Sequence, residues 1–301
     1  MRFPRAYAVR ALLCAILACL APFAAAQPTS EARTFLWEVT SITNRAFLFG
    51  TIHAGKREWY PLPRVVEDAL ADSEVLAVEA DISDTDAIAK TAGAMSYTPP
   101  DELAKHVPPA DFARYGEQLA RLGMPMSTMK NLKPFAAVSV LVFGEWARLG
   151  YLSQYGVDGY LIQRAKAAKK KLVEVEGVEA QGKLMESITE DEHRQAFTGT
   201  LDALDAGLTG EQIEGMVKAW KSGDAFLMYE IARRYNEKVP GSKELEDKFV
   251  WSRHKAMLEK VEGYLNRSKE RHFIAVGALH LAGPKGLIEE LRAKGYLVRQ
   301  R

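Results

Sequence analysis

The pattern of apolar and polar positions predicts strands near both ends of the chain. The apolar segments Thr34–Thr40 and Ala46–Phe49 flank the polar stretch Ser41–Asn44, and together they predict a β-hairpin. A helix is predicted over residues 63–72, where apolar positions recur on one face behind a proline. Val75–Val78 is a short uninterrupted apolar run, typical of a strand buried on both faces. Strand, helix and strand in this order indicate the crossover unit of an α/β fold.

The remainder of the chain alternates long helical stretches with single strands. Helical periodicity with proline breaks covers about residues 84–170, and a second helical stretch covers about residues 184–265. Strands are predicted at Leu172–Val175, Phe273–Val276 and Tyr296–Val298. We therefore predict an α/β fold with a mixed, largely parallel sheet and two helical insertions.

The first 26 residues have the pattern of a signal peptide. Arg2, Arg5 and Arg10 precede the apolar run Ala11–Phe23, and three alanines at 24–26 offer a cleavage site. The run is too short to span a bilayer comfortably. We therefore expect an exported protein, periplasmic or secreted, whose mature part is a single domain of residues 27–301 without a transmembrane segment.

The signal segment also contains both cysteines of the chain, Cys14 and Cys19. Lipidation at Cys19 is the alternative to cleavage, although the residues before it fit that pattern imperfectly. The mature chain has no thiol, which excludes a disulfide, a cysteine nucleophile and a thiolate metal ligand. Loss of the three signal-segment arginines leaves 37 basic and 39 acidic residues, a net charge of −2. This balance does not favour a nucleic-acid partner.

Two strand ends carry the same short motif. Gly50-Thr-Ile-His53 follows one apolar run and Gly277-Ala-Leu-His280 follows another, each with a second glycine shortly afterwards. Glycine lets the backbone turn sharply and approach a ligand. One such histidine alone could equally be a packing or capping residue. The matched pair favours two imidazoles brought to one site.

Carboxylates also follow strand ends, where open α/β sheets bind their ligands. Glu79 and Asp81 follow Val75–Val78, and Glu176 follows Leu172–Val175. Two histidines and a carboxylate, with water in an open position, are typical of a hydrolytic metal centre. The alternative is structural, because such acids also stabilise the N-termini of the following helices.

Arg253 is a further candidate. If residues 245–265 form one helix, Arg253 lies about 40° from Phe249, within the apolar face. A guanidinium there requires a carboxylate, a phosphate or a polar cleft. It could form an ion pair with a strand-end acid or polarise a substrate carbonyl. Neighbouring His254 has no independent support, and His193 is expected to be solvated.

The absence of several motifs narrows the chemistry. The sequence has no H-E-x-x-H, G-x-S-x-G, G-x-x-x-x-G-K-[ST] or G-x-G-x-x-G motif. A classical zincin, an α/β-hydrolase triad, a P-loop enzyme and a dinucleotide reductase are therefore disfavoured.

These residues resemble the TraB/GumN family, which is related to the Tiki proteins and more remotely to erythromycin-esterase-like (EreA) and ChaN-like folds. The resemblance covers the mature chain in order. Its matching pieces are Leu48–His53, Val78-Glu79, Leu132–Phe135, Gly156–Asp158, Glu176-x-x-Glu179-x-Gln181, Arg253 and Ala275–Gly283. One departure is His254, where the family commonly has asparagine.

The resemblance implies a function as well as a fold. Tiki relatives are metal-dependent proteases that need both Gly-x-x-His motifs and an acidic residue. Carried over, this makes His53, Glu79 and His280 the metal-binding and catalytic set, with Arg253 and Gln181 in support. The metal would be Mn, Co or Zn, because nitrogen and oxygen ligands suit several divalent ions.

The sequence therefore predicts an exported metal-dependent hydrolase that acts on a peptide or a small molecule. One alternative is a non-catalytic protein that sequesters a peptide or a haem-like ligand on the same fold. Another is a metal-free esterase in which one histidine is the general base.

Overall fold

A six-stranded sheet with the order β4-β3-β5-β2-β1-β6 forms the centre of the fold. The computed structural model describes residues 33–301, apart from the side chains at 87, 88, 90 and 92. The predicted signal segment and its two cysteines therefore lie outside the described residues. The strands are β1 (Leu36–Thr40), β2 (Arg45–Thr51), β3 (Val75–Val78), β4 (Lys171–Glu174), β5 (His272–Gly277) and β6 (Leu297–Gln300).

The strand directions confirm the predicted mixed, largely parallel sheet. Strands β2, β3, β4 and β5 are parallel, and β1 pairs antiparallel with both β2 and β6. Thr51 of β2 pairs with Gly277 of β5, and Val78 of β3 pairs with Ala275 of β5. The carboxyl ends of these three strands consequently lie at one edge of the sheet.

The burial of the strands follows their place in the sheet. Every residue of β3 is buried, and so are nearly all residues of β2 and β5, because helices cover both faces of the centre. Lys171 and Glu174 of the edge strand β4 are exposed, as expected for a strand with only one neighbour.

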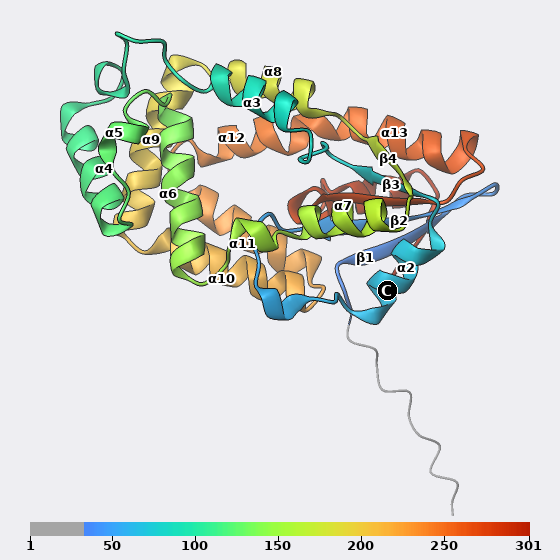
Figure 1. Cartoon of the computed structure of the whole chain (residues 1–301). Helices are drawn as coiled ribbons and strands as arrows, with labels where there is room; N and C mark the ends of the chain where they lie inside the picture. The colour runs from blue at the N-terminus through green and yellow to red at the C-terminus, as the bar shows by residue number, and fades with distance from the viewer. Residues whose placement is uncertain (1–32) are drawn as a thin grey trace, which may run out of the picture. The chain divides into compact units, whose positions relative to one another are not determined.

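Helices lie on both faces of the sheet (Figure 1). On one side are α2 (Arg64–Asp72) and α7 (Val157–Ala167), which are joined by the Tyr160 hydroxyl donating to Glu67 at 2.5 Å. On the other side is α13 (His254–Arg267), whose Met257, Val261 and Leu265 are part of the main core. Helix α14 (Leu287–Ala293) adds three buried apolar side chains to that core.

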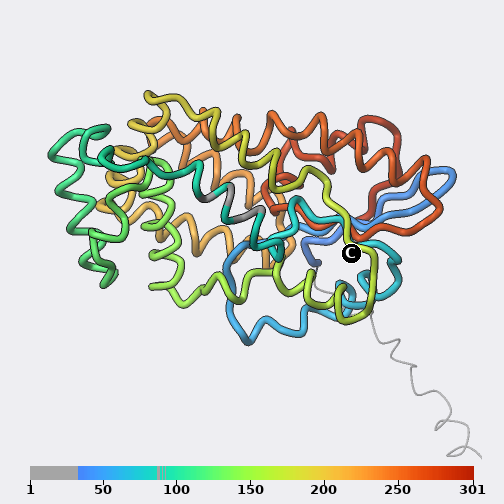
Figure 2. The backbone as a smooth tube through the Cα atoms, turned by 45° about the horizontal axis from the view of Figure 1, so that its top comes forward, coloured from blue at the N-terminus to red at the C-terminus, as the bar shows by residue number. Residues whose placement is uncertain are grey.

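The two helical insertions lie against each other at one end of the sheet (Figures 1 and 2). Helices α3 and α8, which are far apart in the sequence, run side by side there. Tyr115 and Phe197, one from each insertion, pack at 5.4 Å in a second apolar core. The helices are α3 (Thr85–Ala94), α4 (Pro109–Arg121), α5 (Met126–Met129), α6 (Pro134–Arg148), α8 (Val178–Glu186), α9 (Glu190–Asp205), α10 (Leu208–Lys221), α11 (Ala225–Lys238) and α12 (Ser242–Phe249).

Residues 245–265 do not form one helix, so the condition on which Arg253 was placed in an apolar helix face is not met. Helix α12 ends at Phe249, a 3₁₀ turn η4 (Trp251–Arg253) follows, and α13 begins at His254. In a continuous helix the Phe249 carbonyl would accept from the backbone N–H of Arg253. Here the Arg253 side chain takes that carbonyl, with Nη1 donating at 2.7 Å, and its backbone N–H donates to Val250 instead.

His193 also differs from the expectation that it is solvated. Its side chain is buried, and its Nδ1 accepts a hydrogen bond from the backbone N–H of Phe135 at 3.3 Å.

None of the helices in residues 33–301 combines the length and apolar character needed to cross a membrane.

Candidate active site

A cleft of about 650 Å³ opens at the carboxyl edge of the sheet. Its lining brings together His53 after β2, Glu79 after β3 and His280 after β5, which the sequence singled out separately. Gln181 of α8 and Arg253, between α12 and α13, reach the same cleft. The three strand-end residues meet because the carboxyl ends of β2, β3 and β5 are in register.

The loop that carries His53 is pinned to the segment before α7. Gly55 and Leu152 form a two-way backbone bridge, with N···O distances of 3.1 and 2.8 Å. The backbone N–H of Val157 also donates to the Ile52 carbonyl at 2.9 Å. The first turn of α7 is thereby held beside the His53 loop, which places Asp158 next to the imidazole.

His53 and Asp158 form a hydrogen-bonded pair. His53 Nδ1 donates to Asp158 Oδ2 at 2.8 Å, which leaves Nε2 for the cleft. The carboxylate of Asp158 outweighs desolvation and raises the pKa of His53 to about 9. This arrangement is the one that orients metal-binding and general-base histidines in proteins.

We expect the substitution Asp158→Asn to lower the pKa of His53 toward its ordinary value. A raised pKa means that the protonated pair contributes stability below pH 6.5, and that this contribution is lost as the pH rises through about 9. Because the His53 side chain is 64% exposed, solvent screens the pair and the effect on stability is small. NMR titration of the His53 ring in a chelator measures the shift, and an unchanged pKa in the variant would contradict the pairing.

Glu79 is the buried anion of the site. Its Oε1 accepts from the backbone N–H of Gly277, and its Oε2 accepts from Arg253 Nη2 at 2.6 Å and Gln181 Nε2 at 3.3 Å. Burial alone would raise the pKa of Glu79, but His280 and Arg253 offset it and hold the pKa near 2. Glu79 is therefore ionised at neutral pH.

The sequence left open whether Arg253 forms an ion pair with a strand-end acid or polarises a substrate carbonyl. In the structure it forms ion pairs with two strand-end acids. Nε donates to Glu176 at 3.0 and 3.1 Å, and Nη2 donates to both Glu79 and Glu176. Nη1 donates to the Phe249 carbonyl at 2.7 Å and to His280 Nε2 at 3.1 Å. All five N–H donors of the guanidinium thus have acceptors.

A chain of hydrogen bonds determines the tautomer of His280. Arginine can only donate, so His280 Nε2 is the acceptor and the ring proton is on Nδ1. That proton is donated to His254 Nε2 at 3.0 Å, and His254 Nδ1 donates to the Lys285 carbonyl at 2.9 Å. Burial lowers the pKa of both rings, to about 3 for His280, so both are neutral. The Nε2 lone pair of His280 is thereby directed toward Arg253 and Glu79.

The two motif glycines allow close approach of backbone. A Cβ on Gly50 would lie 2.9 Å from the Cα of Ala278, so the β2 and β5 ends could not come together. A Cβ on Gly277 would lie 3.2 Å from Glu79 Oε1, the atom that the Gly277 N–H binds. Trp220 Nε1 further fixes the first loop by donating to the Gly50 carbonyl at 2.7 Å.

The structure does not bring Asp81 into the cleft. Asp81 accepts from the backbone N–H of Ser83 at 2.9 Å in the turn after β3, and its own N–H donates to Glu174. Glu176 lies behind Arg253 as its partner.

Two residues of the site were missed by sequence reasoning. Asp158 was not singled out for a role in the site, and it lies in the first turn of α7, behind the N-cap Gly156. His254 had no support because its role depends on His280, which is 26 residues away. A signal existed for Asp158, since it belongs to a motif block of the resembling family.

The donor set can be tested for its fit to a divalent ion. His280 Nε2 and Glu79 Oε1 are 3.5 Å apart, a separation that suits two ligands of one ion, about 2.0–2.2 Å from each. Glu79 and Glu176 carry two negative charges against the single charge of Arg253, which leaves a net attraction for a cation. The residues are therefore chemically suited to bind a divalent ion.

In this structure Arg253 occupies the lone pair of His280 that an ion would need. Within residues 33–301, no three His, Cys, Asp or Glu side chains converge as a metal-binding group. The lone pair of His280 Nε2 is used by Arg253 Nη1, and one lone pair cannot serve both partners. Binding of an ion to His280 therefore requires that this hydrogen bond be broken.

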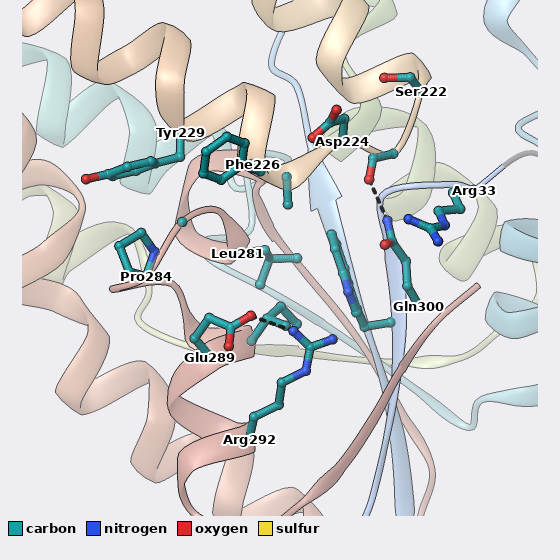
Figure 3. Close-up of a pocket in the computed structure, with 15 residues that line it drawn as sticks. Arg33, Ser222, Asp224, Phe226, Tyr229, Leu281, Pro284, Glu289, Arg292 and Gln300 are labelled. Carbon is teal, nitrogen blue, oxygen red and sulfur yellow. Dashed lines mark hydrogen bonds and ion pairs between the residues drawn. The ribbon is translucent and has the colours of Figure 1, made fainter.

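A second cavity, of about 690 Å³, lies between the N-terminus of α11 and the segment that follows His280 (Figure 3). Phe226, Tyr229, Leu281 and Pro284 line it, and Glu289 pairs with Arg292 at its rim. Its described lining contains no histidine, so the larger cavity is not the one with the strand-end chemistry.

The chain has recognisable relatives. It is 26% identical over 264 residues to the uncharacterized protein YbaP of Escherichia coli (strain K12), a match that covers 86% of this chain and 93% of YbaP. It is 24% identical to a metalloprotease TIKI homolog of Amphimedon queenslandica and 25% identical to metalloprotease TIKI2 of Xenopus tropicalis. These two matches cover 89% of this chain but only 61% and 60% of the TIKI proteins. No solved structure matches at a significant level.

The family assignment rests on nearly the whole described chain. The sequence profile of the TraB/PrgY/gumN family matches residues 35–300, from the first strand to the last. This range includes every residue of the cleft described above. The chain therefore belongs to the TraB/PrgY/gumN family.

Proposed function

We propose that this protein is an exported, metal-dependent hydrolase of peptide bonds. The observation that carries the proposal is that one cleft is lined by both an oriented histidine, His53, and the His280–Glu79 pair. The similarity to proteins named metalloproteases supports the reaction class. Export rests on the signal pattern of residues 1–26, which leads to the periplasm or the medium.

His53, Glu79 and His280 would hold the ion. A divalent ion there would supply Lewis acidity to the scissile carbonyl and to the attacking water. Asp158 orients His53 so that Nε2 is directed at the cleft, and the His254–Lys285 chain does the same for His280. His280 is thereby held in the tautomer that a ligand requires, whereas His53, with a pKa of about 9, must lose its Nε2 proton when an ion binds.

Glu79 is assigned as a ligand rather than as the general base. A base is most effective when its pKa lies near the working pH, and the pKa of Glu79 is about 2. Arg253 is assigned as a positioning residue, because its N–H groups are engaged by Glu79, Glu176, His280 and a backbone carbonyl. An oxyanion could be bound by Arg253 only in exchange for one of these partners.

The His53–Asp158 pair supports a second candidate, a metal-free hydrolase. In this reading the deprotonated form of His53, a minority at neutral pH because its pKa is about 9, takes the proton of water on Nε2 as the water oxygen bonds to the carbonyl carbon, and later gives it to the leaving group. Here Arg253 would keep its hydrogen bond to His280. The ligand-sequestering alternative requires neither step.

Metal binding separates these candidates. Equilibrium dialysis of the mature protein against Mn²⁺, Co²⁺ or Zn²⁺ is expected to give about one ion per chain. Glu79→Gln and His280→Ala should lose that ion, with circular dichroism showing whether each variant remains folded. A folded wild-type protein that takes up none of the three ions would refute the metal-dependent proposal and leave the metal-free candidate.

A further inference from the structure

The walls of the cleft differ in chemistry from its base. The base is formed by strand ends and holds the polar groups, whereas the walls come from the two helical insertions. Large apolar side chains line these walls, among them Phe143 and Trp146 of α6, Met185 of α8, Met216 of α10 and Phe249 of α12. The sheet thus provides the candidate chemistry, and the insertions provide an apolar surface above it.

This apolar surface is open to solvent. Phe143 is 46% exposed and Ile82, on the loop after β3, is 49% exposed, and both line the cleft. Trp146, Met185 and Met216 are half-buried. A contiguous apolar surface in contact with water is costly, and in proteins it marks a site that a partner or a substrate covers.

The wall residues suit one kind of side chain. Aromatic rings give a large apolar contact area, and the unbranched, polarizable methionines adapt to irregular shapes. The charged residues that line the cleft are strand-end or site residues, and those on the described insertion walls are limited to Asp158 and Arg253, which face His53 and Glu79. Both wall charges are already paired, so a charged substrate side chain would have to displace His53 or Glu79 to bind there.

We infer that the protein recognises peptides that carry large apolar side chains next to the scissile bond. The wall is part of the same cavity as His53 and His280, so a peptide bond held at the base places its flanking side chains against Phe143 and Ile82. This inference rests on the proposed function, because it defines the substrate class of that site.

Binding of two matched peptides tests the inference without turnover. Acetyl-Ala-Ala-Phe-Leu-Ala-Ala-amide and acetyl-Ala-Ala-Ser-Asn-Ala-Ala-amide are titrated calorimetrically into the wild-type protein in EDTA. Covering the Phe and Leu side chains removes apolar surface from water, so the apolar peptide should bind at least about tenfold more tightly.

Two matched variants locate the contact. Phe143→Ser should weaken binding of the apolar peptide by about tenfold and leave binding of the polar peptide unchanged. Phe226→Ser is the control, because Phe226 is also an exposed phenylalanine, at 69%, but lines the second cavity. It should change neither affinity.

The possible outcomes distinguish a failure of the apolar-peptide inference from a failure of the hydrolase proposal. Equal affinities for the two peptides, or equal losses in the two variants, would overturn the inference. Cleavage of peptides without any preference for apolar residues would also overturn it and leave the hydrolase proposal standing. Tight binding of the apolar peptide without cleavage under any metal condition would support the inference and refute the hydrolase.

Discussion

Replacing Arg253 by methionine is expected to lower the free energy of unfolding by about 3–5 kcal/mol. The guanidinium is 12% exposed and is the cation between the buried carboxylates of Glu79 and Glu176. Methionine keeps an unbranched apolar stem but leaves both acids without a cation, which is the costly way to break a buried ion pair. Urea denaturation of wild type and variant at pH 7 measures the difference.

The pH dependence of the stability loss distinguishes the loss of the cation from a packing defect. In the wild type, Glu79 contributes stability above its ordinary pKa of 4.5, and this is lost as the pH falls through about 2. Without Arg253, burial raises the pKa of Glu79, so the variant is least stable at neutral pH and the gap to wild type narrows on acidification. A gap that does not depend on pH would contradict the electrostatic account.

Arg233 offers a matched control. It also contacts two carboxylates, those of Glu230 and Glu237, but it is 41% exposed. Arg233→Met should therefore cost less than about 1 kcal/mol, as expected for solvated ion pairs.

Replacing His53 by alanine is expected to reduce peptide hydrolysis by about a hundredfold or more. In the proposed metal-dependent reaction the substitution removes a ligand, and in the metal-free alternative it removes the general base. Stability should fall by less than about 1 kcal/mol, because most of the His53 side chain is exposed. Comparing the loss in kcat/KM with the change in the free energy of unfolding separates an effect on the reaction from an effect on stability.

His106→Ala is the control for this substitution. His106 is also paired with an aspartate, with Nε2 and Asp101 3.0 Å apart, but it does not line the cleft. Activity should be unchanged in this variant. An equal loss in the two variants would mean that His53 acts through stability rather than through the reaction.

Much of the fold could be predicted because the strands of this sheet are unusually clear in the sequence. The fully buried strand β3 is an unbroken apolar run, and the hairpin β1–β2 has a polar turn between two apolar segments. The shared cleft of His53, Glu79 and His280 followed from one rule, that parallel strands present their carboxyl ends at one edge.

What could not be predicted depends on contacts between distant segments. Asp158 is 105 residues from His53, and its place in the first turn of a helix has an adequate local explanation. The break between α12 and α13 arises because the Arg253 side chain takes the carbonyl of Phe249, and no local pattern encodes that competition. The role of Arg253 likewise became clear only when its two carboxylate partners were in place.

The helical insertions matter for the proposed function because their side chains line the cleft. Helices α6 and α8 belong to different insertions, yet both contribute apolar side chains to one cleft. This division between a catalytic sheet edge and binding loops or insertions is common in α/β proteins.

The most direct test of the proposed function is cleavage of a mixed peptide library, followed by mass spectrometry. We predict that the mature protein with Mn²⁺, Co²⁺ or Zn²⁺ cleaves library peptides, that EDTA abolishes the cleavage and that added metal restores it. His53→Ala should give no cleavage above background under the same conditions. Cleavage that persists in protein shown by elemental analysis to be free of metal, or that is unchanged in His53→Ala, would contradict the account.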